Sequence, residues 1–325
     1  MSEEIVLDVK HLTVSFTIRR GTAKAVNDVS FQLHKGEILG LVGESGCGKS
    51  VTSKSILRIL PKDITTFTGT VEYKGVNILQ LSDKELEAYR GNRISMIFQE
   101  PMVSLDPLFS IGSQLEEALL AHEKMSKQEA RQKVLDVLND VGIPSPEIRI
   151  KQYPFELSGG MRQRIMIAMA LLMHPDILIA DEPTTALDVT IQAQILRLLK
   201  DINQKYGTAI ILITHDLGVI AECADHVAVM YAGKIVEKAP VQDIFKHPQH
   251  PYTQGLLQSI PTLEKQEGEL HSIPGIVPSI YHLPEGCAFC ARCPYGMACC
   301  QSGEVPEVVS GERMVRCWKQ GGESR

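Results

Sequence analysis

The sequence has few aromatic residues, no long apolar run and no excess of positive charge. Aromatic side chains make up 5% of its 325 residues, and only 1 of them is a tryptophan. The net charge of -6 argues against nucleic-acid binding, because domains that bind nucleic acids carry an excess of basic residues. The longest apolar stretch, residues 165–173, is too short to span a bilayer. An apolar content of 44% and a charged content of 22% are those of a globular protein.

The sequence also lacks a recognisable export signal. Its first residues have neither the basic nor the apolar segment of a signal peptide, so we expect a cytosolic protein with reduced thiols. A length of 325 residues exceeds one ordinary core, and periodicity weakens after about residue 240. We therefore expect two domains, residues 1–240 and 241–325. Of the 8 cysteines, 6 lie after residue 286, which favours metal binding over disulfides.

Residues 43–50 match the pattern G-x-x-x-x-G-K-[ST], which forms a phosphate-binding loop between a strand and a helix. That context is present, because an apolar strand is expected over 38–42 and a helix over 50–60. The glycines let backbone N–H groups face a phosphate chain, and the helix N-terminus adds partial positive charge. Lys49 is expected to reach the β- and γ-phosphates of ATP, and Ser50 to ligate Mg²⁺. The predicted nucleotide-binding residues here are Gly43, Glu44, Ser45, Gly46, Cys47, Gly48, Lys49 and Ser50.

The hydrophobic pattern predicts an α/β protein of the P-loop NTPase class. Alternating residues over 5–34 indicate antiparallel strands, which form an antiparallel β subdomain. Helical patterns dominate residues 100–165, so we expect a helical insertion there. Capping boxes that begin at Ser82 and Ser126 predict two helix starts. A small, loop-rich extension that contains the cysteines is expected after residue 240.

A second group of candidate residues follows the buried strand expected over 177–180. Asp181 and Glu182 end this strand, as in the Walker B arrangement, which fixes a carboxylate beside the nucleotide. Asp181 is expected to hold Mg²⁺, and Glu182 to act as general base toward the attacking water. Phe16 is a candidate for stacking on the adenine ring, and a place in the core is an equally good interpretation of it.

The stretch 157–164 resembles the signature motif of ABC-type ATPases. Ser158 is a good N-cap, and the two glycines after it leave N–H groups open at a helix start, which gives a second phosphate-binding end. Other motifs of that family stand in order along residues 5–240. Gln99 resembles its glutamine loop, residues 186–188 its dimer-contact loop, and His215 its switch histidine.

The resemblance implies an ATPase that works as a dimer. Two ATPase domains would meet head to tail, so that each ATP lies between one subunit's phosphate loop and the other's signature helix. Gln99 would sense Mg²⁺ and the water, and His215 would contact the γ-phosphate. The residues implied are Glu182, His215 and Gln99 for catalysis; Ser50, Gln99 and Asp181 for Mg²⁺; and Ser158, Gly159, Gly160 and Gln163 for ATP.

Further stretches, at 100–107, 189–194 and 250–257, resemble the ATPase subunits of oligopeptide, dipeptide and nickel ABC importers. This resemblance implies a peripheral subunit on the cytoplasmic face of the membrane. Its partners would be a second ATPase subunit, usually a paralogue, two permeases and, indirectly, an extracytoplasmic binding protein. Peptide is favoured because that branch is the commoner one, and nickel or another small solute stays open. A soluble ABC ATPase and an ATP-responsive iron–sulfur sensor are the alternatives from other classes.

The cysteines near the C-terminus add a metal prediction. By resemblance, a [4Fe–4S] cluster is held by Cys287, Cys293, Cys300 and Cys317. Cys290 and Cys299 depart from the family pattern, and the spacing of Cys287, Cys290 and Cys293 also matches the start of a ferredoxin motif. Four thiolates can equally hold structural zinc, so the metal and its ligand set stay open. In either case we expect the metal to organise the tail and to take no part in hydrolysis.

Cys47 carries a separate expectation. It lies inside the phosphate loop, near Lys49 and a helix start, and both features lower the pKa of a thiol. We therefore expect alkylation of Cys47 to block ATP binding and ATP to protect it. The simpler interpretation is a small residue that fits the loop.

Overall fold

The structure, a computed structural model, describes residues 4–19, 21–99, 104–185, 187–260 and 272–321. These residues form two compact units. The first unit comprises the described parts of Met1–Val6, His34–Glu37 and Gln80–Ile211. The second unit comprises the described parts of Leu7–Leu33, Ile38–Leu79 and Leu212–Arg325. Both units draw on distant parts of the chain.

The second unit contains the predicted antiparallel β subdomain. Strands β1 and β4 pair antiparallel, with Leu7 opposite Tyr73 and Phe16 opposite Thr65. The register shifts after Lys10, where Gly69 has a φ of 88° and a Cβ on it would lie 2.4 Å from the His11 carbonyl oxygen. Only glycine fits this close approach at positive φ. The strands, in the spatial order β2-β1-β4-β5, are β1 (Ile5–Ile18), β2 (Gly21–His34), β4 (Thr65–Tyr73) and β5 (Val76–Asn77).

A second run of strands in this unit carries the phosphate loop at one end. Strand β3 is buried along its whole length and pairs parallel with β9, which forms an antiparallel hairpin with β10. The C-terminal hairpin of β11 and β12 then adds to the edge of β10. The run, in the order β11-β12-β10-β9-β3, consists of β3 (Ile38–Val42), β9 (His226–Tyr231), β10 (Lys234–Pro240), β11 (Glu307–Ser310) and β12 (Arg313–Arg316).

The helix after the phosphate loop is shorter than predicted. Helix α1 (Lys49–Ile56) ends four residues before the expected end at 60, because Leu57 caps it and Arg58 takes a positive φ of 50°. Its buried hydroxyls bond to the helix itself, as Thr52 does to the Gly48 carbonyl at 3.0 Å. The other helices of this unit are α9 (Leu217–Cys223), α10 (Val241–Lys246), α11 (Pro251–Gln258), η3 (Cys290–Arg292) and η4 (Ala298–Cys300), with η1 (Ile78–Gln80) at the boundary between the units.

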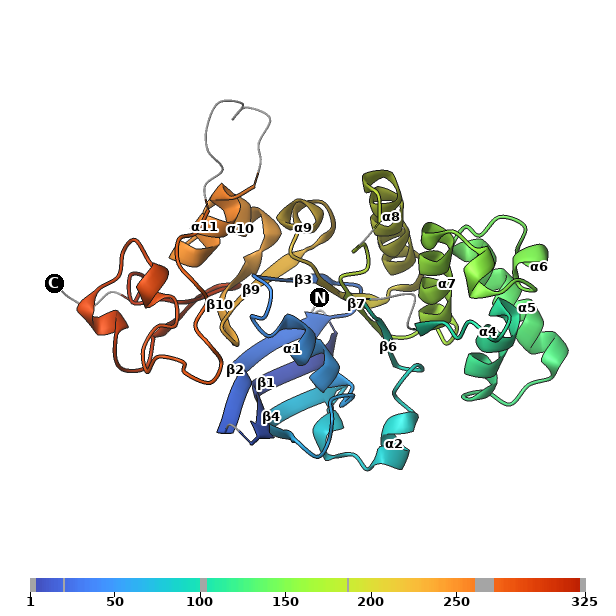
Figure 1. The fold of residues 1–325 in the computed structure, drawn as a ribbon, viewed down its shortest axis with the longest axis horizontal. Helices are drawn as coiled ribbons and strands as arrows, with labels where there is room; N and C mark the ends of the chain where they lie inside the picture. The colour runs from blue at the N-terminus through green and yellow to red at the C-terminus, as the bar shows by residue number, and fades with distance from the viewer. Residues whose placement is uncertain (1–3, 20, 100–103, 186, 261–271, 322–325) are drawn as a thin grey trace. The chain divides into compact units, whose positions relative to one another are not determined.

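The first unit has parallel strands and the helical insertion. Strand β6 (Ile94–Ile97) pairs parallel with β7 (Ile177–Asp181), and β8 (Ala209–Ile213) begins in this unit. Both predicted capping boxes are confirmed, at Ser82 and at Ser126. Helices α4, α5, α6 and α7 pack together (Figure 1, green) and confirm the insertion. The helices are α2 (Asp83–Glu87), α4 (Ile111–Leu120), α5 (Lys127–Asp140), α6 (Pro146–Arg149), η2 (Pro154–Glu156), α7 (Gly159–Leu171) and α8 (Val189–Tyr206).

No helix within the described ranges combines the length and the apolar character that a membrane span needs.

Candidate functional site

The phosphate loop depends on two glycines that no other residue can replace without strain. Gly43 has a φ of 150°, and a Cβ on it would lie 2.2 Å from the Met230 carbonyl oxygen on β9. Gly48 has a φ of 109°, and a Cβ on it would lie 2.6 Å from the Ala25 carbonyl oxygen on β2. The loop backbone is therefore seated directly against the two strands, in a conformation that favours glycine.

The loop closes around Lys49, whose side chain is held inside it. Lys49 is only 5% exposed, and its Nζ donates to the carbonyl oxygens of Gly43, at 2.6 Å, and Glu44, at 3.1 Å. Ser50 follows it at the start of α1 and is half-buried. A buried ammonium beside the N-terminus of a helix attracts anions, as the sequence predicts for a phosphate site.

The expected pKa of Cys47 was wrong in direction. The thiol is only 1% exposed, and this burial raises its pKa, outweighing the opposite effect of the Lys49 ammonium. A Cβ on Gly43 would lie 2.8 Å from the Cys47 Sγ, which shows how tightly the loop surrounds this side chain. A buried thiol with a raised pKa is a poor nucleophile, so selective alkylation of Cys47 is no longer expected. The simpler interpretation, a small residue that fits the loop, agrees with this packing.

Glu44, which the sequence predicts to bind nucleotide, also contacts the C-terminal part of the chain. Its carboxylate pairs with Arg292 at 2.7 Å, and its backbone N–H donates to the hydroxyl of Tyr252 at 2.9 Å. Neither contact was predicted from the sequence. Since Arg292 lies 248 positions away, no local pattern could have revealed the pair.

In the first unit, two residues that the sequence predicts to take part in hydrolysis, Gln99 and Glu182, are in contact. The Gln99 Nε2 donates to the Glu182 Oε2 at 3.0 Å, and the Thr185 hydroxyl donates to the same oxygen at 2.9 Å. Glu182 has a positive φ of 47°, a strained conformation that occurs often at functional sites. Asp181, at the end of β7, is buried. Thr185 was missed, although its position three residues after Glu182 suits a hydroxyl-to-carboxylate bond.

The signature helix begins as predicted. The Ser158 hydroxyl accepts from the Met161 N–H at 3.3 Å and caps α7, and Ser158 itself is exposed. A Cβ on Gly160 would lie 3.0 Å from the Ile191 side chain on α8, so glycine allows the two helices to approach. Gln163 differs from the other members of the motif, because its side chain is only 2% exposed and lies in the interior.

Three further predicted residues, His215, Phe16 and Asp188, lie at or near the surface of the structure. His215 follows β8 and is exposed, so it is not a core histidine. Phe16 is half-buried on β1. In the dimer-contact stretch, Asp188 caps α8 by accepting from the Ile191 N–H at 3.0 Å, whereas Ala186 lies outside the described residues. Residues 100–103 of the stretch after Gln99 also lie outside them.

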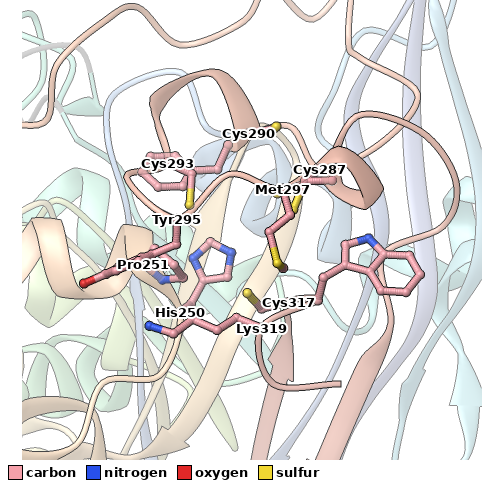
Figure 2. A pocket seen from close by; sticks show the side chains of 12 residues that line it. His250, Pro251, Cys287, Cys290, Cys293, Tyr295, Met297, Cys317 and Lys319 are labelled. Carbon is pink, nitrogen blue, oxygen red and sulfur yellow. The ribbon is translucent and has the colours of Figure 1, made fainter. Parts of the chain in front are cut away.

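The cysteine-rich tail forms one small cavity in the second unit. Figure 2 shows the thiols of Cys287, Cys293 and Cys317 facing the same space as the His250 imidazole. Cys290 and Cys300 also line this cavity, which has a volume of about 20 Å³. Cys299 does not line it and is exposed. Of the two cysteines that depart from the family pattern, Cys290 therefore lines the cavity and Cys299 does not.

The electrostatics of this cavity disfavour charge unless a cation enters. Burial, with smaller contributions from the neighbouring thiols Cys300, Cys317 and Cys293, raises the pKa of Cys287 to about 11. Burial also lowers the pKa of His250 to about 3, which keeps the imidazole neutral. Among the described side chains, no group of three or more His, Cys, Asp or Glu is arranged to hold a metal ion. The donor types suit a thiophilic metal, and binding would require these side chains to rearrange.

Two family models match the chain. The model for ABC transporters matches residues 26–185, and the model for the oligopeptide/dipeptide transporter C-terminal region matches residues 236–300. The chain is 56% identical over 319 residues to the dipeptide transport ATP-binding protein DppD of Bacillus subtilis (strain 168), covering 98% of this chain and 95% of the relative. It is 52% identical to the oligopeptide transport ATP-binding protein OppD of the same organism, covering 96% and 88%.

Solved structures are also similar to this chain. The dimeric structure of MJ0796, a bacterial ABC transporter cassette, matches with a TM-score of 0.65 and 28% identity, covering 72% of this chain and 98% of that one. A post-hydrolysis state of the same cassette, bound to ADP and Pi, matches with a TM-score of 0.64 and 27% identity, over the same shares of 72% and 98%.

Proposed function

The chain belongs to the family of ATP-binding subunits of oligopeptide and dipeptide ABC transporters, and we propose that it hydrolyses ATP to power the import of peptides. Relatives along nearly the whole chain are named as dipeptide and oligopeptide transport proteins, which supports peptide as the substrate class. The observation that carries the hydrolytic part is the Glu182 carboxylate, held by Gln99 and Thr185. A general base must be oriented toward the water it deprotonates, and these two donors orient it.

The predicted residues take distinct roles in this proposal. The phosphate-loop amides and the Lys49 ammonium bind the phosphates, and Phe16 stacks on the adenine. Ser50, Asp181 and Gln99 would hold Mg²⁺, which neutralises charge on the phosphates. Glu182 accepts a proton from the water that attacks the γ-phosphate, while His215 contacts that phosphate. The products are ADP and inorganic phosphate.

A second ATPase subunit, a paralogue by resemblance, completes each nucleotide site in this proposal. Ser158, Gly159 and Gly160 would reach the ATP held by the partner subunit, and the exposed start of α7 supports this role. The buried Gln163 would support α7 from within and not contact nucleotide. ATP bound by both subunits would favour the closed pair, and hydrolysis would release it.

The helical insertion supplies a surface for the permeases on the cytoplasmic side of the membrane. Backbone bonds from Ile111 to Gln152, at 2.8 Å, and from Gly112 to Ile150, at 2.7 Å, bring the start of α4 beside the segment before η2. Large apolar side chains remain exposed along these two segments, and such a patch favours protein contact. They are Leu108 (79%), Phe109 (53%), Tyr153 (40%) and Phe155 (69%).

Reconstituted transport tests the proposed function. The chain would be purified together with the permeases, the second ATPase subunit and the binding protein encoded beside it, and placed in lipid vesicles. We expect ATP-dependent uptake of a labelled dipeptide or oligopeptide. Uptake of nickel without peptide would favour the nickel alternative. ATP hydrolysis with no dependence on permeases would favour a soluble ABC ATPase, and iron-dependent ATP binding without transport would favour the sensor.

We also propose that the cysteine cavity holds a [4Fe–4S] cluster on Cys287, Cys293, Cys300 and Cys317, with zinc as the alternative. Three observations support a metal: the thiols line one cavity, each is at least half-buried, and burial together with the neighbouring thiols raises the pKa values of Cys287, Cys293 and Cys317. When bound, the metal would supply positive charge to neighbouring thiolates and tie the tail together.

Metal analysis of the anaerobically purified chain separates these cases. We expect iron and acid-labile sulfide with visible absorbance in the unchanged protein, and their loss in Cys293→Ser. Cys299→Ser is the matched control, because Cys299 is exposed and lies outside the cavity. Zinc without sulfide would support the alternative metal. A Cys293→Ser protein that retains its full metal content would contradict the ligand set.

A further inference from the structure

Arg292, between two cysteines of the tail, is directed at the phosphate loop. Its Nη1 lies 2.7 Å from the Glu44 Oε2, and its Nη2 lies 3.0 Å from the Glu44 Oε1, which makes a bidentate ion pair. Bidentate pairs between arginine and carboxylate are among the strongest hydrogen-bonded contacts in proteins. Arg292 is only 8% exposed, so solvent screens this pair much less than a surface pair.

The other donors of Arg292 are also satisfied, which fixes the guanidinium in place. Nε donates to the Pro274 carbonyl at 3.0 Å, and Nη2 donates to the Ile273 carbonyl at 3.2 Å. The guanidinium also lies 5.8 Å from the Tyr231 ring centroid and 5.9 Å from that of Phe289. A guanidinium with this many contacts has a fixed position, so it also restrains the carboxylate that it binds.

Glu44 connects Arg292 to Lys49, the lysine that the sequence predicts to bind phosphate. Its carboxylate binds Arg292, its N–H donates to the Tyr252 hydroxyl at 2.9 Å, and its carbonyl accepts from the Lys49 Nζ at 3.1 Å. Glu44 therefore contacts both the Arg292 guanidinium and the Lys49 ammonium. These polar contacts of Glu44 fix its place at the start of the loop.

The anchors come from one rigid aromatic cluster, formed by Tyr231, Tyr252 and Phe289. Ring centroids lie 4.6 Å apart for Tyr231 and Tyr252, 5.2 Å for Tyr231 and Phe289, and 5.4 Å for Tyr252 and Phe289. All three side chains are almost completely buried. Burial raises the pKa of Tyr252, so its hydroxyl stays neutral while it accepts from the Glu44 N–H. The cluster packs β9, α11 and the tail against one another beside the phosphate loop.

We infer that Arg292 is a positioning residue for the nucleotide, which fixes the phosphate loop and the Lys49 ammonium through Glu44. The C-terminal region would thereby set the affinity for ATP, although it carries none of the predicted phosphate-binding residues. This inference rests on the proposed function, because it presumes that ATP is the ligand of the loop. It assigns to the tail a role in nucleotide binding that is independent of any metal.

The inference predicts a specific change in nucleotide affinity. We expect Arg292→Gln to weaken ATP and ADP binding about tenfold, since charge-assisted bonds contribute on this scale, and to change kcat by less than about threefold. Arg292→Lys keeps the charge but cannot form the bidentate ion pair, so it should bind nucleotide more tightly than Arg292→Gln and more weakly than the unchanged protein. Arg292 and Glu44 act through one contact. The double variant, Glu44→Gln with Arg292→Gln, should therefore bind ATP and ADP no more weakly than Arg292→Gln alone.

The experiment measures Kd for a fluorescent ATP analogue and for ADP, and KM and kcat for ATP, on the full chain. Arg316→Gln is the matched control, because Arg316 forms ion pairs with Asp28, at 2.9 Å, and Glu307, at 2.7 Å, in the same unit. It should lower the unfolding temperature and leave Kd unchanged. If Arg292→Gln fails to fold, Glu44→Gln alone is expected to weaken nucleotide binding.

Two results would overturn the inference. The first is an unchanged Kd in Arg292→Gln, or in Glu44→Gln where the former does not fold. The second is a loss of affinity equal to that of Arg316→Gln at a matched loss of stability, which would indicate a general structural effect. Failure of the proposed function is distinct, because the unchanged protein would then neither bind nor hydrolyse ATP.

Discussion

The Glu182→Gln variant is expected to hydrolyse ATP about 10²- to 10⁴-fold more slowly than the unchanged protein, the range typical of general-base removal. ATP binding should be preserved. Glutamine has nearly the same shape, and its amide oxygen can still accept from Gln99 and Thr185, as Glu182 Oε2 does at 3.0 and 2.9 Å. What glutamine cannot do is take a proton from the attacking water, so only the chemical step should suffer.

Single-turnover phosphate release, with ATP binding measured in parallel, checks this expectation. Glu147→Gln on α6 is a suitable control, because Glu147 is exposed and belongs to the same unit. A closed pair of ATPase subunits should accumulate with ATP in the Glu182→Gln protein and not in the control. Hydrolysis within about threefold of the unchanged rate would assign the role of base to another residue.

The Lys49→Ala variant is expected to bind nucleotide much more weakly. The Lys49 ammonium is buried in the loop, 2.6 Å from the Gly43 carbonyl, so its removal leaves carbonyl oxygens where the phosphates need a cation. Hydrogen bonds to a charged group contribute roughly 1.5–3 kcal/mol each, which corresponds to a loss of affinity of about 10- to 100-fold. Hydrolysis at a fixed ATP concentration below the new Kd should fall with it.

Calorimetric titration with ATP and Mg²⁺ measures this loss directly. Lys54→Ala, on the same helix, is the matched control and should bind ATP normally. A Lys49→Ala protein with an unchanged Kd would remove the phosphate loop from the proposed site. Together, the two variants separate binding from chemistry, since Glu182→Gln should bind ATP normally and hydrolyse it slowly, whereas Lys49→Ala should bind ATP weakly.

Features that depend on near neighbours in the chain could be predicted from the sequence. The loop glycines, both capping boxes and the Ser158 cap follow from local backbone rules, and the structure confirms the caps. The end of α1 could not be predicted in the same way. Leucine and isoleucine continue beyond Ile56, and the left-handed turn at Arg58 is not favoured by its residue type.

Features that depend on tertiary contacts could not be predicted. Cys47 has a lysine and a helix start beside it, yet its burial in the folded loop decides the direction of its pKa shift. The pair of Glu44 and Arg292 joins positions 248 residues apart, and nothing near either residue indicates the other. Thr185 is the intermediate case, because its spacing from Glu182 allows the bond but does not require it.

The C-terminal hairpin has a practical consequence for work on shortened proteins. Strand β12 covers the outer edge of β10, and its Arg313 lies 3.3 Å from the carboxylate of Glu237, which is fully buried at 0% exposure. Removing the chain after residue 300, where the matched C-terminal region ends, would bare that edge and strip Glu237 of its counter-charge. Bare strand edges recruit other chains, so insolubility of such a truncate would reflect self-association and not an inherently unstable nucleotide-binding part.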